Sequence, residues 1–426
     1  MKNKRLISFI VLVFITLSNL LLADSNIQVI KHANIYTMGP EGLILDASMV
    51  IKDGKIVAVG KNIELPMGVK YIDANGGSIT PGLFNSVTHL GVQEVSAIRR
   101  TDDFKTTDDA ITASLKVADA FNPRSVLIPQ NRIYGLTHAL VMPDSGTGLI
   151  AGQAAFIDLS AAEHSVINDS VAMVMNLGEA GQSFAGGSRA AAIRQLKTLL
   201  NDVKDYAKNK TAFNQGNRRE YSASQDDLEA LIPILTGKKL LIVSIHRAAD
   251  IERFIKLAEE YDLNVVLAGV EEGWMVADKI SAAGMAVIID PSRNLPSSYD
   301  ALGSRLENAA LLHKAGVKLI FTGIGWQNTH NAYLVRQAAG IAVANGLPKQ
   351  EAIAAITSNP MTLFSQNTLS SEIREGAVAD FVMWQGDPLE VTSEAVLVYI
   401  DGQKIPMVSR STRLRDRYFK RLKNMK

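Results

Sequence analysis

The stretch from Pro81 to about Phe364 constrains the fold most, because short apolar runs alternate there with stretches of helical periodicity. Helices are predicted, for example, at Ala249–Tyr261 and Tyr333–Asn345. The predicted strands are Leu83–Thr88, Thr137–Met142, Ala154–Leu159, Val171–Leu177, Leu240–His246, Asn264–Gly269, Ala286–Ile289 and Lys318–Thr322. This alternation predicts an α/β fold, a (β/α)8 TIM-type barrel over residues 81–365.

The segments on either side of the barrel have strand character. Each contains a hairpin-turn dipeptide, Asp53-Gly54 before the barrel and Asp401-Gly402 after it. Each segment is too short to bury a core alone. We therefore predict that residues 24–80 and 366–409 form one small β-sandwich-like module, with the barrel inserted between its two parts.

The N-terminus has the pattern of a secretory signal peptide. A basic stretch at residues 2–5 precedes the apolar run Leu6–Leu22, which ends at the small residue Ala23. We expect cleavage after Ala23, which removes residues 1–23 and gives a secreted or periplasmic protein. The alternative is an uncleaved membrane anchor. We expect no integral membrane segment after cleavage.

Charge and cysteine content exclude some classes of partner. The net charge is +1, which favours no nucleic-acid partner. The absence of cysteine excludes disulfides and a lipid-anchored cysteine. Residues 410–426 form a basic C-terminal tail with apolar residues at helical spacing. Two interpretations stay open for it, an amphipathic helix that touches anionic lipid and a solvated helix packed on its own protein.

Five segments carry a resemblance to a known family. ITPGLFNSVTHLG at Ile79–Gly91 and VIKDGKIVAVG at Val50–Gly60 resemble the first-strand signature and the opening hairpin of the amidohydrolase superfamily. Gly346–Phe364 and Arg374–Glu390 resemble its last barrel helix and returning strand segment. The segment from Gly135 is similar to the imidazolonepropionase-like, often periplasmic branch. The resemblance implies a hydrolase of non-peptide C–N bonds that uses a divalent metal such as Zn.

The resemblance also implies a set of metal ligands, namely two His on strand 1, a Lys or Glu on strand 4, a His on each of strands 5 and 6, and an Asp on strand 8. His89 matches the second strand-1 position, and His246 matches strand 5. Glu179, just past strand 4, is a substitute candidate. These three residues are the candidate metal ligands.

Several of the implied ligand positions hold residues that cannot bind a metal through a side chain. Val87 stands at the first strand-1 His, and Gly269 stands near the strand-6 His. Gly323 occupies the position of the family Asp, which also serves as general base. The metal site is therefore expected to be degenerate, and the catalytic residue is unassigned.

Other polar residues are candidates for substrate binding. Arg189 follows the glycine-rich run Leu177–Ser188, where backbone N–H groups could hold an anion, and the favoured alternative is an ordinary capped helix. His330 lies in the loop after strand 8, at the face where barrels carry function. Several acidic residues also follow predicted strands on this face, namely Glu94, Asp144, Glu271, Glu272 and Asp290. The alternative for each is an ordinary solvated loop residue. His138 is expected to be packed in the fold.

Two functions remain open. The first is a hydrolase that acts on a small amide-like molecule through a reduced or rebuilt site. The second is an inactive homologue that binds a ligand or serves as the silent subunit beside an active paralogue; a homo-oligomer is also open. The fold does not decide between them, because function depends on the site.

Overall fold

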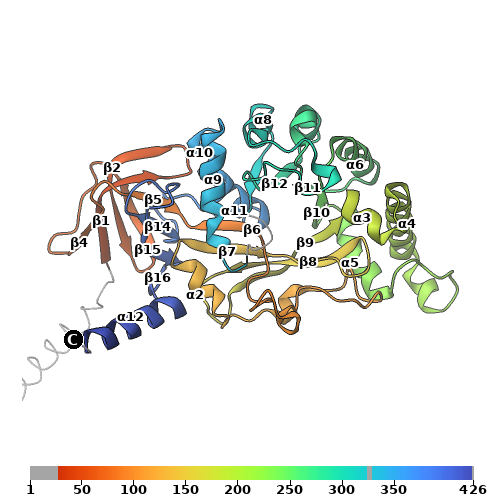
Figure 1. Ribbon diagram of the computed structural model, residues 1–426, viewed down its shortest axis with the longest axis horizontal. Helices are drawn as coiled ribbons and strands as arrows, with labels where there is room; N and C mark the ends of the chain where they lie inside the picture. Colours follow the sequence, from red (N-terminus) through yellow and green to blue (C-terminus); the bar gives the residue numbers. More distant parts are fainter. Residues whose placement is uncertain (1–26, 324–328, 425–426) are drawn as a thin grey trace, which may run out of the picture.

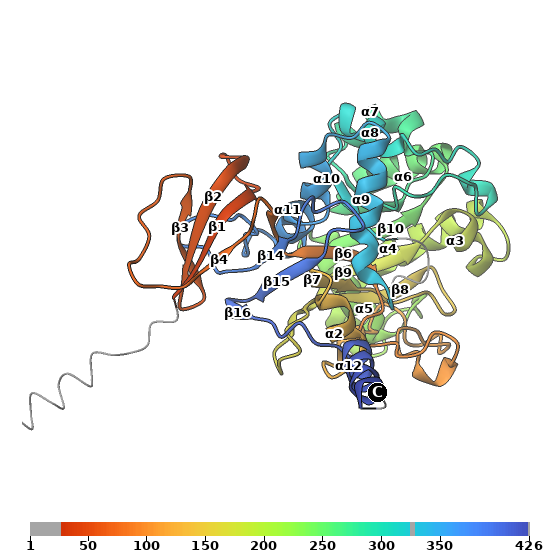
Figure 2. The same cartoon turned by 60° about the vertical axis from the view of Figure 1, so that its left-hand side comes forward.

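The computed structural model describes residues 27–323 and 329–424, so the predicted signal peptide lies outside the described residues. Within these residues the strands form two sheets of eight strands each. One sheet belongs to a β module and the other to the barrel, and Figures 1 and 2 show the module beside the barrel. This arrangement confirms the predicted fold class, a TIM-type barrel with a β module built from both chain ends.

The β module joins the two ends of the chain in a single hydrogen-bonded sheet. Its strands are β1 (Ile27–Tyr36), β2 (Leu43–Lys52), β3 (Lys55–Gly60), β4 (Tyr71–Asp73), β5 (Ser78–Pro81), β14 (Phe381–Trp384), β15 (Ala395–Ile400) and β16 (Gln403–Lys404). The order is β16-β15-β14-β5-β1-β2-β3, with β4 added on β1. The antiparallel pair β5–β14, in which Pro81 lies opposite Phe381, connects the N-terminal and C-terminal parts.

The two hairpin dipeptides form turns that pack against each other. Asp53-Gly54 connects β2 to β3, and Asp401-Gly402 connects β15 to β16, with positive φ at all four residues. A Cβ atom on Gly402 would lie 2.9 Å from Cα of Gly54. Glycine is therefore required at both turns for backbone conformation and for close approach.

The barrel contains one strand that departs from the predicted alternation. Its strands are β6 (Leu83–Thr88), β7 (Leu136–Val141), β8 (Ile150–Asp158), β9 (Val166–Asn176), β10 (Leu240–Ile245), β11 (Val265–Gly269), β12 (Ala286–Ile289) and β13 (Leu319–Phe321), adjacent in chain order. β8 pairs antiparallel with both β7 and β9, and the other pairs are parallel. Loops 142–149 and 159–165 replace helices there, because antiparallel neighbours need no crossover.

Side-chain hydrogen bonds bridge the seam between the first and last barrel strands. Thr322 Oγ1 donates to Asn85 Oδ1 over 3.0 Å, and Asn85 Nδ2 donates to the Ala332 carbonyl over 2.8 Å. The Phe84 N–H donates to the Ile356 carbonyl. The helical segment after β13 thus supplies partners that a β6–β13 ladder would otherwise provide.

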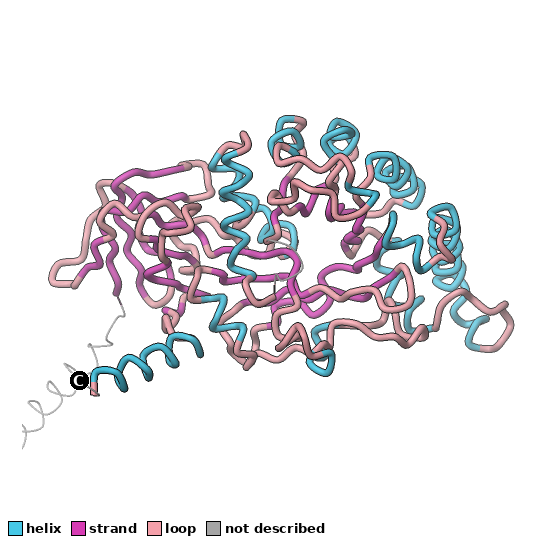
Figure 3. The backbone as a smooth tube through the Cα atoms, in the orientation of Figure 1, coloured by secondary structure: helices cyan, strands magenta, loops and turns pink. Residues whose placement is uncertain are grey.

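Helices cover much of the outside of the barrel, and loops cover the rest (Figure 3). The helices of this layer and its connections are α2 (Leu127–Arg132), α3 (Gly178–Phe184), α4 (Arg189–Asn214), α5 (Gln225–Leu235), α6 (Ala248–Tyr261), α7 (Ala277–Ala282), α8 (Asn308–Lys314), α9 (Val335–Ala344), α10 (Lys349–Ala355) and α11 (Ser358–Phe364). Interior side chains such as Phe156 and Ile242 fill the barrel. Phe364 of α11 stacks on Phe84 and covers the N-terminal end, so the opposite end is left for a site.

A buried polar pair lies between the barrel and the β module. His138 Nε2 on β7 is 3.7 Å from Asp380 Oδ2, just before β14. Burial lowers the pKa of His138 to about 4, and burial raises the pKa of Asp380 to about 7. Thr137 Oγ1 is 2.8 Å from His138 Nδ1. His138 is therefore a packed residue of the fold, as expected from the sequence.

The basic tail forms α12 (Arg410–Lys423), capped by Ser409. Ser411 Oγ donates to Gln130 Oε1 of α2, while Tyr418 and Phe419 are exposed. Figure 1 shows α12 at the edge of the molecule. Within residues 27–323 and 329–424, no helix combines the length and apolarity needed to cross a membrane.

Candidate active site at the mouth of the barrel

A cavity of about 300 Å³ lies where the barrel strands end. Its lining alternates along each strand in two layers, an apolar one and then a polar one nearer the mouth. On three strands the pairs are Val174 and Asn176, Ile242 and Ser244, and Ile288 and Asp290. Residues two apart on a strand face the same side, so the periodicity of the strands places the polar layer above the apolar one.

The side chains of His246 and Glu271 form a close hydrogen-bonded pair in this cavity. Their atoms Nδ1 and Oε2 are 2.5 Å apart, and both side chains line the cavity. The parallel register pairs Ile245 with Gly269, so the residues just beyond β10 and β11 meet at the same edge. Only 10% of the Glu271 side chain is exposed, which makes it a buried partner of His246 rather than a solvated loop residue.

Each member of this pair stabilises the charged form of the other. Burial alone would lower the pKa of His246, but the hydrogen bond and charge of Glu271 outweigh it and raise the pKa. Burial would likewise raise the pKa of Glu271, yet the hydrogen bond and charge of His246 lower it. The pair therefore holds a proton on Nδ1 of His246, pointed at Glu271.

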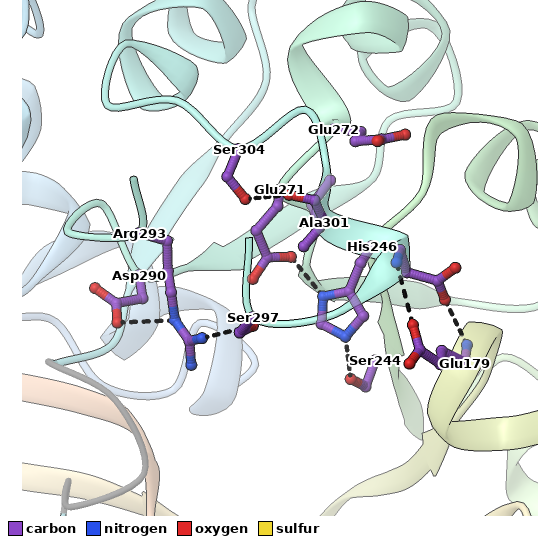
Figure 4. Close-up of polar contacts among 12 residues, drawn as sticks. Glu179, Ser244, His246, Glu271, Glu272, Asp290, Arg293, Ser297, Ala301 and Ser304 are labelled. Carbon is purple, nitrogen blue, oxygen red and sulfur yellow. Dashed lines mark hydrogen bonds and ion pairs between the residues drawn. The ribbon is translucent and has the colours of Figure 1, made fainter. Parts of the chain in front are cut away.

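The opposite nitrogen of His246 faces a hydroxyl. Ser244 Oγ is 3.4 Å from His246 Nε2, and Figure 4 shows Ser244, His246 and Glu271 in a row. Ser244 was not among the site residues predicted from the sequence. The spacing Ser244-Ile245-His246 on a strand was the available signal, because it directs Ser244 and His246 to one face.

His89 occupies the other side of the cavity. Its ring stacks on Phe104, with centroids 3.8 Å apart and planes at 1°. His89 Nε2 is 3.7 Å from Asp144 Oδ1, and the His89 N–H donates to Thr329 Oγ1. Burial would raise the pKa of Asp144, but its hydrogen bond and charge interaction with His89 lower it. His89 is thus held by a carboxylate and an aromatic face.

Arg293 brings a positive charge to the cavity. Its Nε is 3.5 Å from Asp290 Oδ2, and its Nη1 donates to Ser297 Oγ (Figure 4). Both Asp290 and Arg293 line the cavity. Glu272, in contrast, accepts backbone N–H groups of Ala248 and Gly303 and holds the start of α6.

Glu179 and Arg189 lie in a neighbouring network centred on Asp300. Glu179 Oε2 accepts the Asp300 N–H, and the Glu179 N–H donates to the Asp300 carboxylate. Arg189 Nη2 binds Asp300, and its Nε is 3.3 Å from Asp250 Oδ2. Arg189 lines an adjacent cavity, and neither Glu179 nor Arg189 is among the described residues that line the barrel-mouth cavity.

His330 lies close to the mouth but faces the loop after β6. Its Nε2 is 3.2 Å from the Glu94 carbonyl oxygen. The Glu94 carboxylate accepts hydrogen bonds from Asn122 and Ser125 and so fixes this loop. Thr329, the neighbour of His330, lines the cavity.

The donor set of the described residues does not fit a metal ion. Val87 and Gly323 line the cavity where the resemblance implies ligands, and neither carries a donor side chain. Across residues 27–323 and 329–424, no group of three or more His, Asp or Glu side chains converges closely enough to hold a metal. His246, a candidate ligand, binds Glu271 through Nδ1, so it could offer a metal only Nε2. A catalytic Zn needs three protein ligands, which these residues do not supply.

No family model matches the chain, but individual proteins are similar to it. The chain is 22% identical over 390 residues to amidohydrolase tasK of Hapsidospora irregularis, an alignment that covers 83% of this chain and 39% of tasK. It is 39% identical over 87 residues to the imidazolonepropionase of Shewanella halifaxensis, covering 18% and 20% of the two chains. The chain thus spans well under two thirds of the length of these relatives.

The fold is also found among solved structures. The crystal structure of an amidohydrolase from Thermotoga maritima superposes with a TM-score of 0.78 at 24% identity, and the match covers 90% of this chain and 100% of that one. The barrel, the β module from both chain ends and the family's motif order agree with this similarity. The chain is thus similar in sequence to amidohydrolase tasK and shares the fold of the Thermotoga maritima amidohydrolase.

Proposed function

We propose that this protein hydrolyses a non-peptide C–N bond of a small amide-like molecule in the barrel-mouth cavity. The single observation that carries the proposal is the buried His246–Glu271 pair, which lines that cavity and directs Nε2 of His246 away from Glu271. A histidine oriented by a carboxylate in this way is suited to general acid–base work. The relatives named amidohydrolase and imidazolonepropionase support the same reaction class.

The cavity suits a small substrate with one polar end. Its volume of about 300 Å³ is at the lower end for ligand pockets. An apolar layer would receive a hydrocarbon part of the substrate. Asn176, Ser244 and Arg293 at the mouth offer donors for a carbonyl or carboxylate.

The test is a screen of the purified protein against cyclic amides, N-acyl amino acids and dipeptide-like amides, with amine release as readout. The matched variants are His246→Gln, which removes the base, and His313→Gln, which removes a half-exposed histidine on α8. The proposal expects turnover that His246→Gln lowers by about 10²- to 10⁴-fold and that His313→Gln leaves unchanged. Equal turnover in wild type and His246→Gln would overturn it.

A second candidate function is ligand binding without turnover, as an inactive homologue or a silent partner subunit of an active paralogue. The observation that favours it is the lack of donors at Val87 and Gly323, in the cavity where the family holds its metal. In that case the screened amides raise the melting temperature without any amine release. The oligomeric state, measured by light scattering alone and after co-expression with a paralogue, tests the subunit role.

We propose separately that the protein is exported. The support is the basic, apolar and small-residue order of residues 2–23. N-terminal sequencing of the protein from the extracellular or periplasmic fraction tests this. The expected first residue is Asp24, and an intact Met1 on a cytoplasmic species would contradict export.

A further inference from the structure

We infer that Ser244, His246 and Glu271 act as nucleophile, base and orienting acid, so that the cavity performs acyl transfer through a serine. This inference rests on the proposed function in one respect, that acyl compounds enter this cavity. It differs from the family's metal chemistry, which the described donor set does not fit. The three residues form a continuous row from Ser244 Oγ through both ring nitrogens of His246 to Glu271 Oε2 (Figure 4).

The direction of the row follows from the hydrogen-bonding capacity of an imidazole. A neutral histidine has one donor nitrogen and one acceptor nitrogen. Because Glu271 accepts the proton on Nδ1, Nε2 is left as the acceptor that faces Ser244. The Ser244 Oγ–Nε2 distance of 3.4 Å is long for a hydrogen bond, as is common for such contacts without a bound substrate.

The packing fixes this orientation. A Cβ on Gly269 would lie 2.3 Å from Cε1 of His246, so the ring fills the space that any other residue at position 269 would take. Glu271 is held by its own burial, with 10% of its side chain exposed. The ring of His246 therefore lies against the Gly269 backbone, between Ser244 and Glu271.

The position of Ser244 gives it access to a substrate. It lies at the end of β10, lines the cavity and is half-buried. A purely structural serine on this strand would be expected to bond a backbone group, but the side-chain contact recorded for Ser244 is the one with His246 Nε2. This arrangement of nucleophile, base and orienting carboxylate is the geometric signature of an activated serine.

The reaction balances without a metal. Ser244 Oγ attacks the acyl carbon while His246 Nε2 takes the hydroxyl proton, and the carbonyl π electrons move to oxygen. When the carbonyl re-forms, the C–N bond breaks and His246 gives its proton to the leaving amine. Water then attacks the acyl-serine while His246 Nε2 takes one of its protons. The bond between the acyl carbon and Ser244 Oγ breaks, His246 returns the proton to Oγ, and a carboxylic acid is released.

Two cavity residues are placed to bind the negative oxygen of the intermediate. Asn176 lies opposite Ser244 in the parallel register of β9 and β10, and its Nδ2 uses one hydrogen for Ser145 Oγ. The second hydrogen of that amide and the Arg293 guanidinium are the charge-stabilising donors.

The test is reaction of the full-length, natively folded protein with a fluorophosphonate probe, which phosphonylates an activated serine and releases fluoride. Labelling is quantified by intact mass, and the modified residue is located by peptide mass spectrometry. We expect one label on Ser244 in wild type. Ser244→Ala abolishes the label, and His246→Gln and Glu271→Gln slow it by about 10²- to 10⁴-fold.

The matched control is Ser304→Ala, because Ser304 bonds the Ala301 carbonyl and does not line the cavity. Its labelling rate is expected to equal that of wild type, and thermal melting confirms that every variant folds. No label on wild type, or an unchanged rate in His246→Gln, would overturn the serine mechanism. Amide turnover that persists in Ser244→Ala would overturn it too, while leaving the proposed hydrolase standing. Labelling of Ser244 without turnover of any amide would support the activation of Ser244 by His246 and Glu271, and it would refute the proposed function.

Discussion

A Cβ atom on Gly269 would lie 2.3 Å from Cε1 and 2.4 Å from Nδ1 of His246. The family resemblance implies a metal-binding histidine near position 269. Here the imidazole of His246 leans into that space and binds Glu271 instead. A contact between two side chains therefore occupies the place where the resemblance implies a ligand.

The first prediction follows from this contact. Gly269→Ala combines a positive φ of 89° with the clash against His246. The strained backbone costs about 1–2 kcal/mol, and the overpacking adds about 1–3 kcal/mol. The imidazole must move, so we also expect the fluorophosphonate label to fall. Urea unfolding and labelling rate measure the two effects.

Gly284→Ala is the matched control for Gly269→Ala. Gly284 also has a positive φ, 65°, but no atom lies within 4 Å of its Cβ position. Gly284→Ala should lose only the stability that the strained backbone costs, and its labelling rate should equal that of wild type. Equal effects of the two substitutions on labelling would contradict the role given to the Gly269–His246 contact.

The second prediction concerns pH. His246 can accept the serine proton only when Nε2 is unprotonated. Burial and the charge of Arg293 lower the pKa of His246, but the hydrogen bond and charge of Glu271 and the charge of Asp300 raise it more, so the pKa lies above the ordinary value of 6.5. The labelling rate of wild type should therefore rise with pH through a midpoint above 6.5.

Substitution of the orienting acid should move that midpoint. Glu271→Gln removes the main charge that favours the imidazolium, so the midpoint shifts to lower pH while the plateau rate falls. Glu272→Gln is the control, because its carboxylate binds backbone N–H groups of Ala248 and Gly303. A rate profile from about pH 5 to about pH 9 that is the same in both variants would refute the assignment.

The third prediction is that metal binding can be restored. Val87→His and Gly323→Asp place donors in the cavity beside His89 and His246, enough ligands for one Zn ion. Chelator competition should show weak or no Zn binding in wild type and a clear gain in the double variant. Adding His89→Ala should remove that gain. Tight stoichiometric Zn binding by wild type would show that the protein has metal ligands other than His89 and His246.

Much of the fold was predictable because it depends on local pattern. The Asp-Gly turns at residues 53 and 401 and the strand from Leu83 to Thr88 carry their own signals and were predicted correctly. The direction of β8 was not, since an apolar run such as Ile150–Asp158 has the same pattern whichever way it runs. The sequence does offer one sign of the antiparallel direction of β8, because the connections from β7 to β8 and from β8 to β9 are too short for crossover helices.

The site was harder to predict, because it depends on register between strands. His246 and Glu271 were both singled out, but one as a metal ligand and the other as a loop acid. Their contact follows from the pairing of Ile245 with Gly269, which no local pattern encodes. Ser244 was missed because its spacing to His246 predicts only a shared strand face, whereas the carboxylate that orients His246 follows another strand, β11.

The fourth prediction concerns the buried pair between the barrel and the β module. Burial, with the nearby charges of Asp158 and Asp401, raises the pKa of Asp380 from 3.8 to about 7. Between these two values the folded protein holds a proton that the unfolded chain has lost, so this group makes stability fall as pH rises. His138 has the opposite effect, because its pKa falls from 6.5 to about 4 and the unfolded chain binds the extra proton in that range.

In wild type, Asp380 and His138 change the stability with pH in opposite directions below about pH 6.5. Asp380→Asn removes only the carboxylate's contribution. The stability of Asp380→Asn relative to wild type should therefore increase steadily from about pH 4 to about pH 7 and then level off. Urea unfolding of both proteins across this range measures the difference. Asp278→Asn, at an exposed aspartate of α7, is the control and should show a difference that does not change with pH in this way. A flat difference for Asp380→Asn would mean that the carboxylate is ionised in the folded protein throughout, so that the pair is a buried His138–Asp380 ion pair instead of two neutral groups.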